Sequence, residues 1–397
     1  MSRILLASEL GANLGHVGQL LPLAIELQAR GHEIVFALRD VSAADALLRA
    51  RGFRCMQAPI WQRRAAGPAA PPCSYSEILL RYGYADSAGL LGLVSAWREL
   101  YRHVAPQIVI AEYAPTALLA ARGLPIARIQ YGVGFSIPPR VSPFPSFRTW
   151  ESVPRERLET SDATVLANIN RALEQSTLPP LSALTGMLDA ERELLCTFRE
   201  LDHYPQRQGA DYHGPVYMDV SGAVPTWPDA GTSRVFVYLR PGRDNMQRVA
   251  RALADTAASV LWIAPGLSPT AARRLESSTL RIATCAVRIA DAAAAADVAV
   301  LHGGHGTVAA MLLAGVPLVL YPTHVEQAIV AGNITRLGAG VASPADAGYS
   351  HIGSVVTKVL GTLNFKNAAE GVAVLYRDYD ARESARRMAD EIELEMA

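Results

Sequence analysis

The stretch "DVAVLHGGHGTVAAMLLAGVPLVLYP", residues 297–322, joins a short apolar run to a cluster of histidines and glycines. Residues 302–307 form this cluster, and a run of small and apolar residues follows it. A buried strand, a glycine turn and a helix in this order make up the repeating unit of a parallel α/β sheet. In such sheets ligands bind at the carboxyl ends of the strands, where glycines let them approach the backbone. The stretch therefore predicts an α/β fold with a ligand site at residues 302–307.

The residues of this loop have the chemistry of a phosphate site. The helix expected after them begins with unpaired N–H groups and the positive end of its dipole, which favour an anion. Thr307 can cap that helix or donate to a phosphate oxygen, and His302 and His305 supply further donors. The glycine spacing matches neither a P-loop nor a GxGxxG turn. A plain glycine turn with solvated histidines stays open, whereas a metal site at the two histidines lacks further ligands at a suitable spacing.

The first half of the chain alternates strand and helix patterns. Near-continuous apolar runs, each followed by a helical pattern or a turn, predict parallel strands at residues 3–9, 33–40, 53–59, 107–112 and 125–132. Helices are expected between them, the first at residues 17–31. Prolines among aromatic residues interrupt this rhythm at 133–150, where neither a central strand nor a helix is expected. A further helical pattern covers about 161–186.

The second half repeats the alternation, which indicates a second domain of the same class. We expect a Rossmann-like domain at 1–215, a second one at 234–375, and a linker rich in Gly, Pro, Ser and Asp at 216–233. The last residues, 376–397, predict a C-terminal helix that packs back on the first domain.

Composition excludes several classes of protein. The 37 basic residues balance the 37 acidic residues, so nothing points to a nucleic-acid partner or a polybasic membrane contact. The four cysteines include no CxxC pair, which predicts free thiols, and no apolar run reaches the ~18 residues that an integral membrane segment needs. Because a strand pattern begins at Arg3, we also expect no secretory signal and a cytoplasmic protein, as a monomer or a homodimer.

Residues 302–340 carry a longer ordered pattern. It contains His-x-Gly-x-Gly-Thr, a helix, Gly-Val-Pro, a strand ending in Pro, an acidic residue followed by Gln, and a helix ending near Gly-x-Gly. This order resembles the donor-binding signature of the UDP-glycosyltransferase-like superfamily, family 1 of the two-domain GT-B class, in its bacterial natural-product type. The resemblance implies a GT-B fold, in which two Rossmann-like domains face each other across a cleft. It also implies an inverting hexosyltransferase that needs no metal or other cofactor beyond its sugar-nucleotide co-substrate.

The same resemblance assigns donor-binding residues. The glycine loop would contact the diphosphate, the Glu-Gln pair would hold sugar hydroxyls, and nearby arginines would neutralise phosphate charge or replace a missing base contact. These residues are His302, Gly303, Gly304, His305, Gly306, Thr307, Glu326, Gln327, Arg240, Arg243 and Arg288. Ala310 stands where plant members carry a ribose-binding glutamate, and no tryptophan precedes the loop to stack on the base. The donor therefore stays open between a UDP-linked and a dTDP-linked sugar.

The segment "SELGANLGHVGQLLPLA", residues 8–24, matches the position where family members carry their catalytic base. His16 matches that base, and an imidazole titrates in a range suited to taking a proton from a hydroxyl. Glu112 stands where the family carries its partner acid, typically an aspartate. The acceptor is expected to be a small lipophilic or aromatic molecule, bound by residues that include Gly15, Tyr82, Phe135 and Phe144.

Other functions stay open on the sequence. A nucleotide-sugar 2-epimerase shares the two-domain plan but uses several carboxylates, which the segment after the first strand lacks. A non-catalytic relative that binds a sugar nucleotide as a sensor or partner protein is the second alternative, favoured by Ala310, Glu112 and the missing tryptophan. An NAD-dependent Rossmann enzyme would need a GxGxxG turn after the first strand, and none is present.

Overall fold

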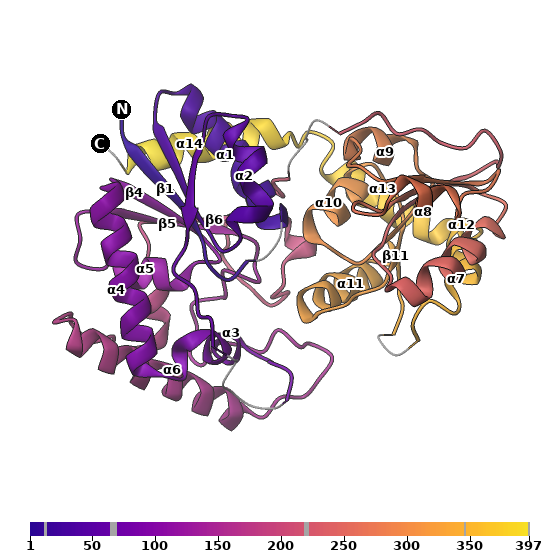
Figure 1. Cartoon of the computed structure of the whole chain (residues 1–397). Helices are drawn as coiled ribbons and strands as arrows, with labels where there is room; N and C mark the ends of the chain where they lie inside the picture. Colours follow the sequence, from indigo (N-terminus) through magenta and orange to yellow (C-terminus); the bar gives the residue numbers. More distant parts are fainter. Residues whose placement is uncertain (12–13, 64–69, 218–221, 345–346, 396–397) are drawn as a thin grey trace. The chain divides into compact units, whose positions relative to one another are not determined.

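The structure, a computed structural model, consists of two compact units (Figure 1). The N-terminal unit comprises Met1–Val216 and Asp380–Ala397, and the C-terminal unit comprises Tyr217–Tyr379. Each unit is an α/β layer structure with one six-stranded parallel sheet in its described part, so the expected fold class is confirmed. The structure describes residues 1–11, 14–63, 70–217, 222–344 and 347–395.

The sheet of the N-terminal unit has the strand order β3-β2-β1-β4-β5-β6. Its strands are β1 (Arg3–Ser8), β2 (Glu33–Leu38), β3 (Arg54–Gln57), β4 (Ile108–Glu112), β5 (Ala127–Gly132) and β6 (Arg192–Leu195). The first, second and fourth strands are buried almost throughout, as the apolar runs predict. The order reverses between β1 and β4, and this switch point is where an open α/β sheet binds its ligands.

Helices cover both faces of this sheet. On one face α1 (Leu14–Ala29) contacts α2 (Val41–Arg49) and α14 (Ala381–Leu394), and on the other α4 (Ser87–Val104) contacts α5 (Pro115–Ala121) and α6 (Arg155–Gln175). The Asp86 side chain caps α4, and Asp380 caps α14. The shorter elements are α3 (Tyr75–Leu79), a π-turn (Leu80–Tyr84) and two 3-10 turns (Leu184–Leu188 and Arg199–Leu201).

Ion pairs bind the last helix to the first one. The Arg30 guanidinium contacts Asp390 Oδ1 at 2.6 Å and Glu393 Oε2 at 2.8 Å, and His32 Nε2 lies 2.8 Å from Glu393 Oε1. The Cys196 thiol lies 3.8 Å from Met388 Sδ, beneath the same helix. The C-terminal helix is therefore part of the N-terminal unit.

Two sequence expectations need correction in their bounds. The helix expected at 17–31 begins three residues earlier, because α1 spans Leu14–Ala29. The helix expected at 161–186 is α6, which begins at Arg155 and ends at Gln175; its first turns are polar and carry no apolar periodicity. Residues 133–150 contain neither helix nor strand, as expected.

The C-terminal unit repeats the topology, with the order β12-β11-β10-β7-β8-β9. Its strands are β7 (Arg234–Tyr238), β8 (Ser259–Ile263), β9 (Leu280–Ala283), β10 (Val298–Leu301), β11 (Leu318–Leu320) and β12 (Gly340–Ala342). Its helices are α7 (Arg243–Ala254), α8 (Pro269–Arg273), α9 (Ile289–Ala295), α10 (His305–Leu313), α11 (Val325–Leu337), α12 (Ile352–Leu360) and α13 (Leu363–Leu375). The order reverses between β7 and β10, which gives this unit a switch point of its own.

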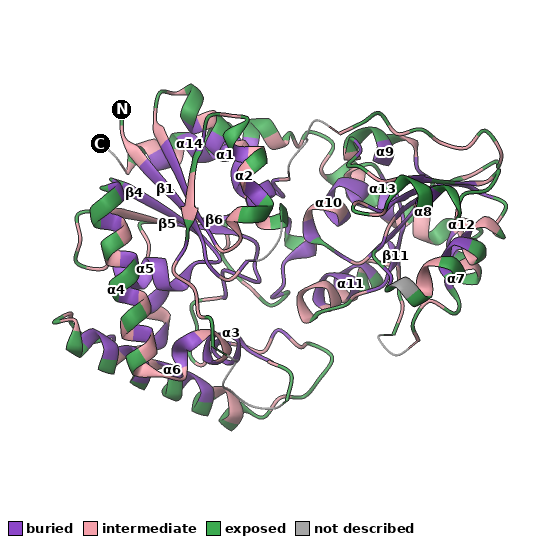
Figure 2. Ribbon diagram, in the orientation of Figure 1, coloured by how far each residue is buried: buried purple, intermediate pink, exposed green. Residues whose placement is uncertain are grey.

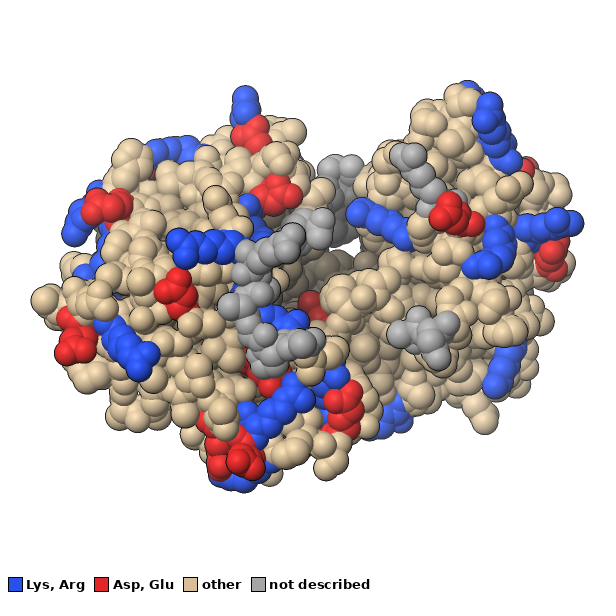
Figure 3. Space-filling view, turned by 60° about the horizontal axis from the view of Figure 1, so that its bottom comes forward, with Lys and Arg blue, Asp and Glu red and all other residues tan. Residues whose placement is uncertain are grey.

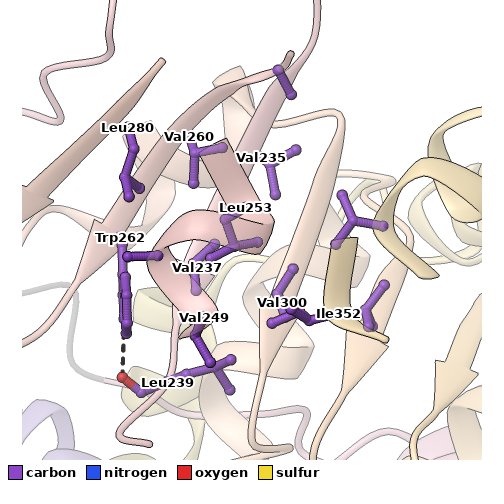
Figure 4. Packing of buried hydrophobic residues seen from close by; sticks show 14 of the residues in the cluster. Val235, Val237, Leu239, Val249, Leu253, Val260, Trp262, Leu280, Val300 and Ile352 are labelled. Carbon is purple, nitrogen blue, oxygen red and sulfur yellow. Dashed lines mark hydrogen bonds between the residues drawn. The ribbon is translucent and has the colours of Figure 1, made fainter. Parts of the chain in front are cut away.

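The core of the C-terminal unit lies between its sheet and α7 and α12. Figure 4 shows Val237, Val249 and Leu253 packed beside Trp262, and the indole N–H of Trp262 donates to Leu239 O at 3.1 Å. Burial of these branched side chains fixes β7 at the centre of the sheet. The loop after β7 is thereby held at the switch point.

The surface agrees with the balanced composition. The central strands are buried, edge strands such as β3 are partly exposed, and the outer faces of the helices are exposed (Figure 2). On the face drawn in Figure 3, acidic and basic side chains are interspersed rather than gathered by sign. No helix in the described part of the chain is both long and apolar enough to cross a membrane. Residues 218–221 of the expected linker lie outside the described residues.

Candidate active site

The switch point of the N-terminal unit brings His16 and Glu112 together. His16 is the third residue of α1, which follows β1, and Glu112 is the last residue of β4. His16 Nδ1 lies 2.8 Å from Glu112 Oε1, and the exposed fractions of the two side chains are 20% and 1%. A carboxylate at Nδ1 selects the tautomer with a proton on that nitrogen, so Nε2 carries the lone pair. The pair has the geometry of an oriented general base.

Ser8 is a third member of this site, and the sequence analysis missed it. Its hydroxyl donates to Glu112 Oε2 at 2.8 Å, and the residue is 2% exposed. Both carboxylate oxygens of Glu112 are therefore engaged, one by the imidazole and one by the hydroxyl. The signal was available, because β1 and β4 pair in the register Ala7 to Ala111, which sets Ser8 beside Glu112.

An aromatic cluster adjoins the histidine. The Tyr113 ring lies nearly parallel to the His16 imidazole, with centroids 6.1 Å apart and an interplanar angle of 26°. Phe135 packs edge-on against Tyr113 at 5.9 Å, and it is buried. Phe144 is fully buried one ring farther away, 5.7 Å from Tyr75.

The other two expected acceptor residues lie at the surface or at its margin. Gly15 is exposed, with no atom within 4 Å of an added Cβ. Tyr82 lies in the kinked π-turn, and the Arg39 guanidinium lies 5.4 Å from its ring centroid. Of the four expected acceptor residues, Phe135 is the one that the described ring contacts link most directly to His16, through Tyr113.

His302 lies at the switch point of the C-terminal unit and bonds to backbone groups on both sides of it. Its Nδ1 lies 2.8 Å from Tyr321 O, and its Nε2 accepts the backbone N–H of Arg240 at 2.8 Å. Burial lowers the pKa of His302, which favours the neutral ring. The imidazole thus joins the ends of β7, β10 and β11. Donation from His302 to a phosphate, as the resemblance implies, would need one of these two hydrogen bonds to break.

The glycine loop shapes the N-terminus of α10. Gly303 has φ +104°, and an added Cβ would lie 3.1 Å from Gln327 O. Gly304 occupies the N-cap position, is exposed, and has no atom within 4 Å of an added Cβ. A Cβ at Gly306 would lie 3.1 Å from Tyr217 Cβ. At Gly303 and Gly306 the loop therefore packs closely against other residues of the C-terminal unit, whereas the space beside Gly304 is open.

His305 and Thr307 both lie in the first turn of α10. No side chain caps α10 in the described part of the chain, so the capping role considered for Thr307 is wrong; Thr307 is the third residue of the helix. His305 is the first residue of α10 and is 5% exposed. An uncapped helix N-terminus presents backbone N–H groups and positive potential, which suits a diphosphate.

The residues expected to hold the sugar begin α11. Gln327 Oε1 accepts from both the backbone N–H and the hydroxyl of Thr323, each at 2.9 Å. Because the side-chain oxygen of Gln327 is engaged with Thr323, its amide nitrogen points away from Thr323 and can donate a hydrogen bond to another group. Glu326 lies in the first turn of the same helix.

The three arginines differ in how far their charges are engaged. Arg240 is exposed, with its guanidinium 6.0 Å from the centroid of the Tyr238 ring. Arg288 is the N-cap residue of α9 and forms an ion pair with Asp291 at 2.8 Å. Arg243 begins α7, and its side chain lies outside the described part. Arg240 is accordingly the arginine that the structure holds directly beside the glycine loop, through the bond of its backbone to His302.

Sequence comparison finds a family match within the last third of the chain. Residues 277–392 match the family model of the erythromycin biosynthesis protein CIII-like C-terminal domain. The PGL/p-HBAD biosynthesis rhamnosyltransferase of Mycobacterium bovis (strain BCG / Pasteur 1173P2) is 30% identical over 175 residues, which cover 41% of this chain and 37% of that protein. The match thus spans little more than a third of the relative's length.

Several solved structures match almost the whole chain, and two of them are compared below. One is CalG4, the calicheamicin glycosyltransferase, with a TM-score of 0.68 and 19% identity, over 100% of this chain and 98% of that one. The chain has the GT-B fold, and its residues 277–392 are similar to the EryCIII-like C-terminal domain. The second is the spinosyn rhamnosyltransferase SpnG complexed with thymidine diphosphate, with a TM-score of 0.65 and 18% identity, over 98% of this chain and 100% of that one. The GT-B fold that the resemblance implies is confirmed.

Proposed function

We propose that this GT-B protein is an inverting glycosyltransferase that moves a hexosyl group from a TDP-linked sugar to a hydroxyl of a small lipophilic or aromatic acceptor. The observation that carries the proposal is the contact of 2.8 Å between His16 Nδ1 and Glu112 Oε1 at a switch point of the sheet. The preference for TDP rests on the complex of SpnG with thymidine diphosphate and on that of the glycosyltransferase VinC with DTDP.

The proposed reaction is a single displacement. His16 Nε2 takes the proton of the acceptor hydroxyl as its oxygen attacks the anomeric carbon of the donor. The bond from that carbon to the phosphate oxygen breaks, and its electron pair leaves with TDP. Glu112 stabilises the imidazolium that forms, and Ser8 holds the carboxylate in place through its second oxygen. An α-linked donor gives a β-glycoside.

The donor diphosphate is assigned to the N-terminus of α10. One further negative charge develops on the diphosphate as TDP departs, and the backbone N–H groups and the helix dipole stabilise it. Arg240 adds a full positive charge from the neighbouring loop, whose backbone His302 holds. The Gln327 amide nitrogen donates to a sugar hydroxyl in this proposal. Helix dipole and side chains supply the charge stabilisation, so no bound metal is required.

The acceptor class follows from the rings beside the base. The edge-on pair of Tyr113 and Phe135 gives a largely apolar aromatic surface near the imidazole. Flat apolar molecules gain more from such a surface than flexible polar ones do, because burial of apolar area drives their binding.

The experiment is turnover of TDP-linked sugars with a panel of phenolic and macrocyclic acceptors, followed by mass spectrometry. We expect His16→Ala to lower turnover by roughly 10²–10⁴-fold while stabilisation by TDP persists. His103→Ala, at the exposed end of α4, serves as the matched control with unchanged turnover. Full turnover by His16→Ala contradicts the base assignment. TDP binding by the wild type without any turnover favours the non-catalytic relative.

A further inference from the structure

Residues Ser8–Gly11, which we call the anchored loop, leave the end of β1 and are held in place at successive residues. The Ser8 hydroxyl bonds to the Glu112 carboxylate at 2.8 Å. Two residues on, the Leu10 N–H donates to Tyr113 O at 3.1 Å. The loop is thus tied to Glu112, at the end of β4, and to the next residue, Tyr113.

Glu9 anchors the same loop from the inside. Its carboxylate accepts the Thr116 backbone N–H at 2.5 Å and the Trp97 indole N–H at 2.7 Å, and the residue is 3% exposed. The Arg39 guanidinium donates to Glu9 O at 3.2 Å. A buried side chain with two directional partners leaves the backbone around it little freedom.

Gly11, at the end of the anchored loop, lies over the imidazole of His16. An ideal Cβ on Gly11 would lie 2.5 Å from both Cδ2 and Nδ1 of His16, and nearer still to Cγ. Similar distances to three adjacent ring atoms mean that this position is above the face of the ring, not at its edge. The backbone of Gly11 is outside the left-handed region, so any residue can adopt its conformation. The three atoms nearest to the added Cβ all belong to the imidazole, which therefore excludes a side chain at this position.

Tyr113 limits the same ring from a second direction. Its side chain lies nearly parallel to the imidazole, and its backbone has φ +48°, a conformation that few aromatic residues adopt. The hydrogen bond from Leu10 to Tyr113 O links this residue to the anchored loop. This hydrogen bond therefore couples the position of the anchored loop to that of Tyr113.

We propose that Gly11 is a positioning residue, which acts by letting the anchored loop close over His16 and keep its Nδ1 on Glu112. This inference rests on the proposed function, in which His16 is the base. In the proposed reaction, Nε2 of His16 must face the acceptor hydroxyl. A ring that is covered on one face can adopt fewer orientations, so less conformational entropy is lost when the acceptor binds.

The structure gives the size of the effect. Ordinary van der Waals contact begins at about 3.4 Å, so a methyl group on Gly11 displaces the imidazole by about 1 Å from the 2.5 Å positions. The side chain moves in preference to the anchored backbone. Because the methyl group lies over the face of the ring, this displacement runs along the ring normal. It lengthens the contact of 2.8 Å with Glu112 by only about 0.2 Å, but it takes the Nδ1–H bond out of line with Oε1 and moves Nε2 by about 1 Å. We expect Gly11→Ala to lower turnover by roughly 10–100-fold.

The first measurement needs no substrate. Ring ¹⁵N signals of the nine histidines are recorded by NMR, and that of His16 is assigned by its loss in His16→Ala. We expect the wild type to hold the Nδ1–H tautomer and Gly11→Ala to shift His16 toward the Nε2–H tautomer. Gly92→Ala is the matched control, because an added Cβ there meets no atom within 4 Å in helix α4. An unchanged His16 signal in Gly11→Ala overturns the proposal.

The second measurement is a double-mutant cycle on turnover and thermal stability. In the His16→Ala background, Gly11→Ala should cost nothing further in turnover, since the ring it displaces is absent. If Gly11→Ala by itself fails to fold, His16→Ala should restore folding, because it opens the same space. A double variant that stays unfolded, or a cost that persists without the imidazole, overturns the proposal. If the wild type turns over no acceptor, the proposed function fails while the NMR result still decides the role of Gly11.

Discussion

Two neighbouring glycines of the donor loop separate the stability of the fold from the binding of TDP. Gly303 has φ +104° and would bring a Cβ to 3.1 Å from Gln327 O. A non-glycine residue in that conformation costs about 1–3 kcal/mol, and the close approach adds to it. For a domain the size of the C-terminal unit, a loss of about 2 kcal/mol lowers the unfolding midpoint by roughly 4–8 °C. We therefore expect Gly303→Ala to destabilise this unit in the absence of any ligand.

Gly304→Ala should leave the stability of the fold nearly unchanged but weaken the binding of TDP. Its φ of −61° and ψ of 126° suit any residue, and no atom lies within 4 Å of the added Cβ. Loss of the glycine at an N-cap costs less than about 1 kcal/mol. The methyl group does project into the open space before α10, where the proposal puts the diphosphate. A tenfold loss of TDP affinity, equal to about 1.4 kcal/mol, is the expected minimum.

Thermal unfolding with and without TDP measures both effects. At 100 times the wild-type dissociation constant, TDP adds about 2.7 kcal/mol to the wild type, which raises the midpoint by roughly 5–10 °C. At the same concentration Gly304→Ala, with tenfold weaker binding, gains about 1.4 kcal/mol, and its shift is about half as large. A full shift in Gly304→Ala refutes the placement of the phosphates at this loop. An unchanged midpoint in ligand-free Gly303→Ala refutes the backbone argument.

Two further predictions concern the N-terminal unit. Ser8→Ala removes a hydrogen bond to the buried Glu112 carboxylate, and such a bond to a charged group is worth about 1.5–3 kcal/mol. Turnover should therefore fall roughly tenfold or more in Ser8→Ala, and Ser8→Thr should restore it. Equal rates for Ser8→Ala and the wild type contradict a role for this hydroxyl. Burial raises the pKa of Glu9 from an ordinary value of 4.5 to about 7. The folded protein therefore holds a proton that the unfolded chain has released, and the free energy of unfolding should fall as pH rises from 4.5 through 7, by up to about 3 kcal/mol. Thermal unfolding at pH 5 and pH 8 should show this loss in the wild type and a smaller one in Glu9→Gln.

Much of the architecture could be predicted because apolar runs and glycine breaks are local signals. The strands from β1 to β5 occur where the pattern puts them, whereas α10 begins at His305, inside the stretch 302–307 that the pattern assigns to a loop. The start of α6 could not be found this way, because its first turns, "RERLET", are largely solvated and carry no apolar stripe. The pairing of β1 with β4 follows from a topology common to α/β folds, and that pairing would have led to Ser8.

Contacts that depend on the path of a loop could not be predicted. The nearness of Gly11 to His16 arises from the anchored loop, whose course is fixed by tertiary bonds to Thr116, Trp97 and Tyr113. The same holds for His302, whose two ring nitrogens meet backbone groups from loops distant in sequence. Residue type suggested a phosphate donor there, but hydrogen-bond partners decide what an imidazole can do.

The two units use one topology to put a histidine at each switch point, and the partners of each ring separate their roles. His16 faces a carboxylate, which stabilises a positive ring and so favours uptake of a proton. His302 accepts a backbone N–H at Nε2, which can no longer bind a proton unless that bond breaks, and burial further lowers its pKa. Of these two histidines only His16 combines a basic nitrogen with a counter-charge. The assignment of the proton-accepting step to the N-terminal unit therefore rests on electrostatics as well as on its position in the fold.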